Sequence, residues 1–100
     1  MRHWGAVAAV ILAMSACSPA PPDDASGVEI YDQLCARCHG DDLTGGIGPA
    51  LGPDSNAATE GDEFLEFTIV NGRGRMPSFE SLDEGQVDRL VGYIREVQGG

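Results

Sequence analysis

The five residues Cys35-Ala36-Arg37-Cys38-His39 constrain this chain more than any other stretch of its 100 residues. The two cysteines are three positions apart, which is about one helical turn, so their sulfurs face the same way. The imidazole of His39 follows directly. The fold must therefore bring two thiols and one imidazole to a common surface.

The order C-x-x-C-H is the attachment motif of a c-type haem. Each sulfur can form a thioether with one vinyl group of the porphyrin, and the histidine can offer a ring nitrogen to the iron. We therefore predict one covalent haem c at Cys35 and Cys38, with His39 as an axial iron ligand. Two alternatives use the same cysteines. A zinc site needs four ligands, so a carboxylate would have to join these three side chains, and a redox dithiol needs a βαβ context, which the sequence lacks.

The charge balance limits the kind of partner. Acidic residues outnumber basic ones by 16 to 6, and the formal net charge is −10. A nucleic-acid-binding surface is basic, so nucleic acid is excluded as a partner. A strongly acidic surface keeps a protein soluble and can steer a basic redox partner toward it, although it can equally be a solvated surface without a partner.

Residues 1–16 have the features of a lipoprotein-type signal peptide. Arg2 gives a positive start, and the apolar run at 4–14 is too short to be a confident membrane span. The run ends in the letters MSAC, which resemble a bacterial lipobox except that leucine is preferred at the first position. We expect cleavage before Cys17, lipidation of its thiol and anchoring on the periplasmic side of a bacterial membrane. An ordinary secretory signal is the alternative.

The remaining chain is long enough for one small domain, which we assign to residues 26–100. Residues 17–25 are rich in proline and aspartate. Adjacent prolines extend and stiffen such a stretch, and the acids keep it solvated. We therefore predict that residues 17–25 form a lipid-anchored tether that holds the domain off the membrane.

Helical periodicity predicts an all-α domain. A capping box opens a helix expected over residues 26–37. A second helix, capped by Thr59 or Asp62, should end near an Asn-Gly pair. A third is expected after a box formed by Ser81 and Glu84, because apolar residues then recur at helical spacing. The stretches between these helices are rich in glycine and proline, which is typical of loops, and a flat cofactor can order them.

The second axial ligand follows by elimination once the signal peptide is set aside. His39 is then the only histidine, so two histidines of one chain cannot ligate the iron. Met76 is the only methionine, and it lies between Arg75 and Pro77 in a loop that can present its sulfur. Methionine is also a common core residue, but this polar loop suits that role poorly. We therefore predict His39/Met76 ligation, which raises the reduction potential.

Residues 26–97 resemble a class I cytochrome c of the short bacterial single-haem kind. Beyond the haem motif and Met76, the matching residues are Gly27, Tyr31, Gly48, Pro49, Leu90 and Tyr93. The resemblance implies a cytochrome c fold, with three to four short helices and long loops wrapped around one covalent haem. It also implies that the first and last helices touch at Gly27, and that Pro49 accepts a hydrogen bond from His39, which would orient the imidazole.

We expect further contacts with the haem from Tyr31, Leu51 and Pro49. Arg73 and Arg75 flank the methionine loop, and either they pair with the haem propionates or they are solvated arginines. The interval from His39 to the methionine is shorter than in mitochondrial cytochrome c, so the haem edge should be more exposed. The lysine ring of the mitochondrial members is absent, so a partner specific for that ring is not implied.

Electron transfer is therefore the predicted function, and the chain is not expected to be an enzyme. With Met76 on the iron, substrate cannot reach it. Single electrons would pass between membrane or periplasmic redox partners, with the chain acting as a free carrier or as a cytochrome subunit of a dehydrogenase or oxidase complex. A haem enzyme or gas sensor, which needs a labile sixth position, is the alternative, and a binding module without haem is a third possibility.

Overall fold

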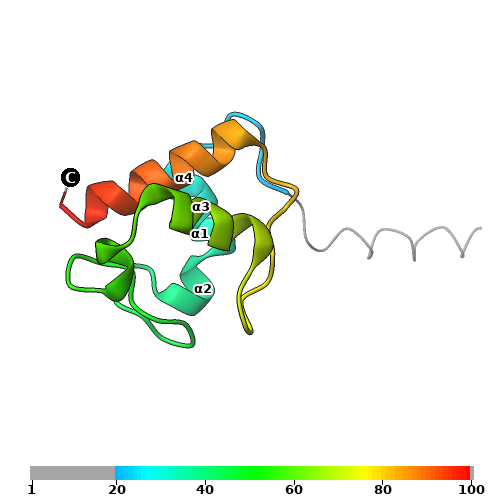
Figure 1. The fold of residues 1–100 in the computed structure, drawn as a ribbon. Coiled ribbons are helices and arrows are strands. Elements are labelled where there is room, and N and C mark those ends of the chain that lie inside the picture. The colour runs from blue at the N-terminus through cyan, green and yellow to red at the C-terminus, as the bar shows by residue number, and fades with distance from the viewer. Residues whose placement is uncertain (1–19, 100) are drawn as a thin grey trace, which may run out of the picture.

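The computed structural model describes residues 20–99, and over this range the chain is helical with long loops (Figure 1). The elements are α1 (Gly27–Leu34), α2 (Ala36–His39), the 3-10 helix η2 (Asn56–Thr59), α3 (Asp62–Asn71) and α4 (Glu84–Val97). Between residues 20 and 99 the β-structure is limited to an isolated bridge between Arg73 and Met76. None of the helices in this range has the length and apolarity needed to cross a membrane. The all-α prediction is confirmed, whereas the signal peptide and Cys17 lie outside the described residues.

α1 and α4 cross in contact at Gly27. A Cβ atom built on Gly27 would overlap the carbonyl oxygen of Arg89 and would lie 2.9 Å from the Cβ of Tyr93. One turn further along α1, Tyr31 is fully buried, and its ring centroid is 5.5 Å from that of Tyr93. The predicted contact between first and last helices is therefore present, and it depends on a residue without a side chain.

The first helix begins as predicted but is interrupted at the first cysteine of the motif. Ser26 and Glu29 form the reciprocal capping box, with N···O distances of 2.8 and 3.2 Å. The N–H of Cys35 closes α1 on the carbonyl of Tyr31 at 2.8 Å, and α2 then begins at the next residue. One continuous helix over 26–37 is therefore a wrong prediction, because the chain turns at Cys35.

The start of α3 also differs from the prediction. Gly61 is the N-cap and no side chain caps this helix. The hydroxyl of Thr59 instead donates to the carbonyl of Asn56 at 2.7 Å, inside η2. The carboxylate of Asp62 accepts from Arg95 at 2.8 Å. Both expected caps are wrong because each side chain has another partner.

α4 begins two residues later than its predicted box. Asp83 is the N-cap, and it exchanges hydrogen bonds with Gln86, each at 2.8 Å. Ser81 precedes the helix because the N–H of Leu82 donates to the carbonyl of Phe79 at 3.1 Å, which places both in a turn. Both tetrads fit the capping-box pattern, and the turn decides between them.

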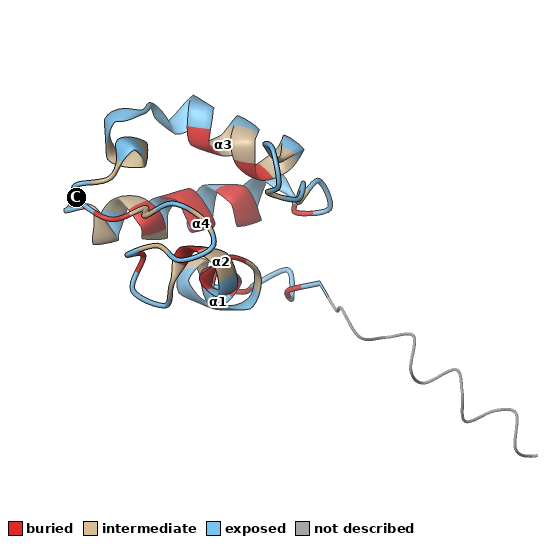
Figure 2. Ribbon diagram, turned by 90° about the horizontal axis from the view of Figure 1, so that it is seen from below, coloured by how far each residue is buried: buried red, intermediate tan, exposed pale blue. Residues whose placement is uncertain are grey.

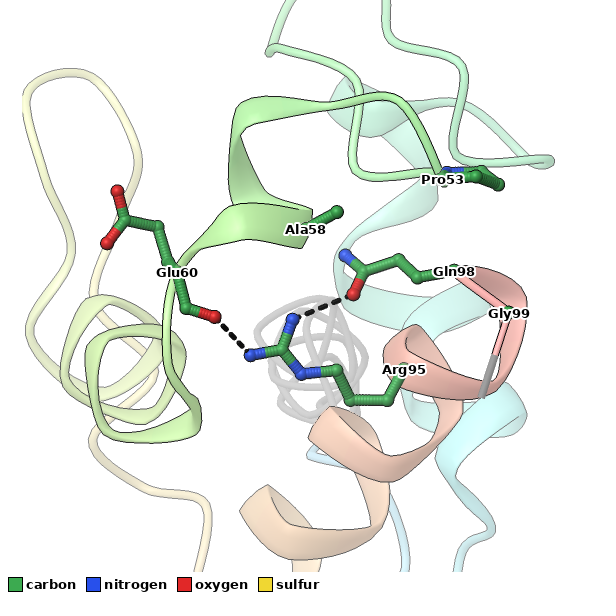
Figure 3. Close-up of a pocket in the computed structure, with 6 residues that line it drawn as sticks. All are labelled: Pro53, Ala58, Glu60, Arg95, Gln98 and Gly99. Carbon is green, nitrogen blue, oxygen red and sulfur yellow. Dashed lines mark hydrogen bonds between the residues drawn. The ribbon is translucent and has the colours of Figure 1, made fainter.

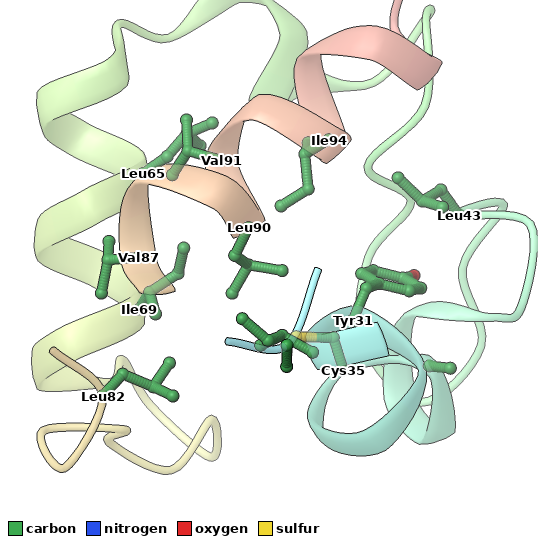
Figure 4. Close-up of a cluster of buried hydrophobic side chains, with 13 residues drawn as sticks. Tyr31, Cys35, Leu43, Leu65, Ile69, Leu82, Val87, Leu90, Val91 and Ile94 are labelled. Atoms are coloured by element: carbon green, nitrogen blue, oxygen red, sulfur yellow. The ribbon is translucent and has the colours of Figure 1, made fainter. Parts of the chain in front are cut away.

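The core lies between α1, α3 and α4 (Figures 2 and 4). Figure 2 shows buried residues on the sides of α3 and α4 that face each other, and exposed residues along the outer side of α3. The buried side chains of α3 and α4 are Leu65, Ile69, Val87, Leu90, Val91 and Ile94. The α4 members recur at the helical spacing that predicted this helix, so that prediction is confirmed.

The described part of the proposed tether packs on the domain. Pro21 and Ala25 are buried, and backbone carbonyls of residues 21–25 accept hydrogen bonds from the side chains of Gln86 and Arg89. Residues 21–25 therefore do not extend away from the domain as predicted, although residues 22–24 are exposed, as expected of a solvated stretch. The sequence could not show this, because the partners lie more than sixty positions away on α4.

Candidate cofactor-binding site

The two cysteines of the motif lie at the junction between α1 and α2. Both are free thiols, with Cys35 buried and Cys38 partly exposed. The N–H groups of Cys38 and His39 both donate to the carbonyl of Cys35, at 3.1 and 3.0 Å, which winds the motif into a single turn. Burial, with a smaller contribution from Cys38, raises the pKa of the Cys35 thiol to about 12, so this thiol is protonated at neutral pH.

The imidazole of His39 is held in one orientation. Its Nδ1 lies 2.7 Å from the carbonyl oxygen of Pro49, and the side chain is 9% exposed. Because the carbonyl can only accept, Nδ1 carries the proton and Nε2 keeps the lone pair that a metal would bind. The hydrogen bond that the family resemblance implied is therefore present.

The loop after α2 is fitted to this ring. The N–H of Gly45 donates to the carbonyl of His39 at 2.8 Å, and the N–H of Gly48 donates to the carbonyl of Cys38 at 2.7 Å. A Cβ on Gly48 would lie 3.0 Å from Cε1 of the His39 ring. A side chain at this position would push the imidazole away from Pro49, so the glycine is part of the site.

Leu43, which the sequence did not single out, ties the same loop to the core. It has a φ of 64°, a region that leucine rarely adopts, and it is 1% exposed. Its carbonyl accepts from the N–H groups of Leu51 and Gly52 at 2.9 and 3.1 Å. Burial of the side chain and these two hydrogen bonds hold the backbone in this strained conformation, so Leu51 is placed against the core.

Met76 lies in a tight loop between α3 and α4. Its N–H donates to the carbonyl of Arg73 at 2.9 Å, and its carbonyl accepts from the N–H of Arg73 at 3.2 Å. Gly72 has a φ of 78°, and a Cβ there would lie 2.6 Å from the Met76 carbonyl oxygen. The side chain of Met76 is partly buried against the core. The loop therefore holds the methionine by backbone contacts that only a glycine allows.

The other predicted contact residues lie in different surroundings. The hydroxyl of Tyr31 donates to the carbonyl of Gly40 at 2.6 Å, and burial raises its pKa. Tyr31 therefore supports the turn after the motif from within the core. The guanidinium of Arg73 lies 5.5 Å from the ring centre of Phe64 on α3, and Arg75 is exposed. Pairing of either arginine with propionates stays a prediction.

Arg95, near the end of α4, connects this helix to the segment between η2 and the start of α3. It forms an ion pair with Asp62 at 2.8 Å and donates to the carbonyls of Ala57 and Glu60 at 3.3 and 2.5 Å. In the sequence this arginine is only a cation near a helix C-terminus, a position that favours positive charge. The sequence did not reveal its partners, which lie more than thirty positions earlier in the same chain. These contacts hold residues 57–62 on α4.

Gln98 extends this contact to the loop of the site. Its Oε1 accepts from Arg95 at 2.7 Å, and its Nε2 donates to the carbonyl of Leu51 at 2.8 Å. The two side chains line a pocket of about 440 Å³ with Pro53, Ala58, Glu60 and Gly99 (Figure 3). Figure 3 shows the Arg95 guanidinium between Gln98 and the Glu60 carbonyl. The Arg95 guanidinium already bonds Gln98 and the Glu60 carbonyl, and no residue of the cysteine motif lines this pocket, so we assign the pocket to the contact between α4 and the loop.

The described geometry favours one of the chemistries that the motif allows. Within residues 20–99 no three His, Cys, Asp or Glu side chains are grouped so that they could hold a metal ion. The two cysteines and His39 therefore do not converge as zinc ligands would. They suit a covalent haem better, because two free thiols lie beside an imidazole whose Nε2 is available. Partly buried apolar side chains that a flat apolar ring can cover include Leu34, Leu51, Val70, Met76 and Phe79.

Comparisons with known proteins agree with this arrangement. The family model described as "Cytochrome C oxidase, cbb3-type, subunit III" matches residues 22–94. The cbb3-type cytochrome c oxidase subunit CcoP of Azospirillum sp. (strain B510) is 35% identical over an alignment of 86 positions that covers 76% of this chain and 29% of CcoP. Cytochrome c-551 of Bacillus subtilis (strain 168) is 44% identical over an alignment of 71 positions that covers 70% of this chain and 60% of that protein.

A solved structure shows the same fold. Dihydro-heme d1 dehydrogenase NirN, in complex with DHE, aligns with a TM-score of 0.64 and 34% identity, over 70% of this chain and 16% of that one. The chain therefore spans less than two thirds of each of these three relatives. The similarity describes one domain, and it covers the cysteine motif and the methionine loop.

Proposed function

This chain belongs to the cytochrome c family, and from that premise we propose that it transfers single electrons through one covalently bound haem c. The observation that carries the proposal is the position of His39. Its Nδ1 is bonded to Pro49 at 2.7 Å, and two free thiols lie within the preceding helical turn. A haem ligated by histidine and methionine supplies one-electron redox chemistry.

Each side chain of the motif has a separate role in this proposal. Cys35 and Cys38 would hold the haem, each through a thioether formed by addition of its S–H across a vinyl group. His39 would offer Nε2 to the iron, while its hydrogen bond to the Pro49 carbonyl fixes the orientation of the ring. Gly48 leaves room for the ring.

We assign the second axial position to Met76. Three observations support the assignment: its side chain is partly buried, its loop is closed by two backbone hydrogen bonds, and Gly72 fits only without a side chain. A neutral thioether favours ferrous over ferric iron, so it raises the potential. With both axial positions filled by the chain, substrate is excluded from the iron, and on this ground we do not expect the chain to be an enzyme.

We further propose redox proteins as partners and an exported location. The net charge of −10 favours a partner with a basic docking surface. Ile47, two residues before Pro49 in the same loop, is 80% exposed and would supply an apolar contact at that surface. Lipidation of Cys17 would keep the domain on the periplasmic side of a membrane, either as a carrier or as part of an oxidase or dehydrogenase complex.

The test uses full-length protein produced with a cytochrome c maturation system. We expect the intact mass to include one haem, the oxidised protein to show the long-wavelength absorption band of iron–methionine bonding, and the reduced protein to bind carbon monoxide poorly. Fast binding of carbon monoxide would contradict the carrier and favour a haem enzyme or gas sensor. A colourless protein would favour a binding module without haem.

A further inference from the structure

We propose that Gln86 and Arg89 clamp residues 21–25 on α4, so that an anchor at Cys17 holds the domain with the start of α4 facing the lipid surface. The orientation rests on the lipidation of Cys17 proposed above. The clamp itself does not depend on lipidation, because it consists of hydrogen bonds between residues that the structure describes. Figure 1 shows the first described residues lying beside the start of α4.

Gln86 forms one half of the clamp. Its Nε2 donates to the carbonyl of Pro22 at 3.1 Å and lies 3.5 Å from that of Pro21. Its Oε1 accepts from the N–H of Asp83 at 2.8 Å, so the same amide caps α4. Gln86 is 4% exposed, and a buried amide needs its hydrogen bonds. Since Pro21 and Pro22 have no N–H, their carbonyls are the only polar backbone groups that these two residues offer.

Arg89, one turn further along α4, forms the other half. Its Nε donates to the carbonyl of Ala25 at 2.9 Å and its Nη2 to that of Asp23 at 2.7 Å. The N–H of Ala25 closes a turn on the carbonyl of Pro22 at 3.0 Å. The methyl group of Ala25 is buried. Four of the five backbone carbonyls of residues 21–25 therefore accept hydrogen bonds from two side chains of one helix.

The clamp shortens the arm between the anchor and the domain. Cys17 and Pro21 are four positions apart, whereas Cys17 and Ser26 are nine apart. An extended chain spans at most about 3.6 Å per residue, so the clamped arm reaches about 14 Å and a free arm about 32 Å. The clamp thus halves the distance that the domain can move away from the membrane.

The charge at this end of the domain determines how it meets the membrane. Asp23, Asp24, Asp83 and Glu84 are all exposed there, and together they outweigh the positive charge of Arg89. Anionic lipids repel these groups over about 8 Å at physiological ionic strength. The short arm keeps this end of the domain near the bilayer, while the acidic side chains prevent the domain from adsorbing to the lipid. The start of α4 therefore faces the membrane without lying on it.

The test compares lipidated holoprotein with a clamp variant in anionic phosphatidylglycerol vesicles. The variant combines Gln86→Glu, which keeps the acceptor for Asp83 but loses the donor, with Arg89→Gln. Asp88→Asn, an exposed neighbour on α4, is the control for substitution on this helix, and neutral phosphatidylcholine vesicles are the control for the more negative net charge of the clamp variant. An unchanged haem absorption spectrum shows that each variant is folded.

Hydrogen exchange measures the clamp directly. We expect the Ala25 amide to exchange about tenfold faster in the clamp variant and at the native rate in the control. Equal rates in native protein and clamp variant would overturn the clamp. This measurement does not depend on the anchor.

Quenching of a fluorescent lipid headgroup by the haem reports the distance between the haem and the membrane, which the length of the arm limits. We expect at least about twofold weaker quenching in the clamp variant, and the same loss when about six glycine and serine residues, which add about 20 Å, are inserted after Ser18 in native protein. Equal quenching in the native protein and both variants would overturn the short arm. An intact mass without acyl chains on Cys17 would overturn the orientation and the proposed anchor, while exchange at Ala25 would still decide the clamp.

Discussion

The crossing of α1 and α4 at Gly27 predicts opposite outcomes for two glycine-to-alanine substitutions. In Gly27→Ala the new methyl group overlaps the backbone carbonyl of Arg89, which cannot rotate away as a flexible side chain would. Overpacking of this kind costs about 1–3 kcal/mol, against less than about 1 kcal/mol gained from the better helix propensity of alanine. We expect a net loss of about 2 kcal/mol in the free energy of unfolding.

Gly92→Ala is the matched control, because Gly92 lies exposed on α4 and a Cβ there meets nothing within 4 Å. This substitution should stabilise the protein by about 0.5–1 kcal/mol. For a domain of this size, 1 kcal/mol corresponds to about 4–8 °C in Tm. Thermal unfolding of the holoprotein, followed by circular dichroism, should show a Tm lowered by about 10 °C for Gly27→Ala and raised by a few degrees for Gly92→Ala. If both variants were equally stable, the argument from close helix contact would be refuted.

Three further predictions concern the iron ligand, the loop and acid stability. Met76→Ala should keep the haem attached but lower the potential in a redox titration and allow carbon monoxide to bind; an unchanged potential would refute the ligand assignment. Arg95→Ala removes charged hydrogen bonds to Asp62 and to two carbonyls, and because the side chain is partly exposed we expect a loss of about 2 kcal/mol in denaturant unfolding; a loss below about 0.5 kcal/mol would show that the loop does not depend on it. The backbone N–H and hydroxyl of Ser26 lower the pKa of Glu29, so the capping box stabilises the folded state at neutral pH and this contribution is lost as pH falls through the lowered pKa. Ser26→Ala keeps the backbone N–H, which is the larger cause, and removes the hydroxyl, so an NMR titration should show that pKa moving part of the way back toward its ordinary value; an unchanged pKa would contradict a contribution from the hydroxyl.

The residues that the sequence could identify are those whose role depends on near neighbours. The cysteine motif, the glycines of the methionine loop and the apolar spacing of α4 can all be read within a few positions. The contact at Gly27 was also predictable, but only through the family resemblance, because the residues around Gly27 do not indicate that it packs against Arg89 and Tyr93 of α4. The same holds for Pro49, whose bond to His39 the resemblance implied and the structure contains.

Other features depended on competition between partners. Thr59 and Asp62 both look like helix caps, yet one hydroxyl bonds within η2 and the other side chain pairs with Arg95. A side chain can satisfy only a limited number of partners, and the choice between a local and a distant one depends on the folded arrangement. The two possible capping boxes before α4 present the same problem at shorter range.

By itself the sequence predicted the chemistry of the site, because it contains two thiols and an imidazole within about one helical turn and one methionine outside the predicted signal peptide. Only the tertiary structure decided which backbone carbonyls meet Gln86, Arg89 and Arg95, and with them the path of residues 21–25 and of the loop after η2. The physical reason is that periodicity and capping act over one or two turns, whereas a polar side chain on α4 bonds whichever carbonyl the packed helices bring within about 3 Å of it.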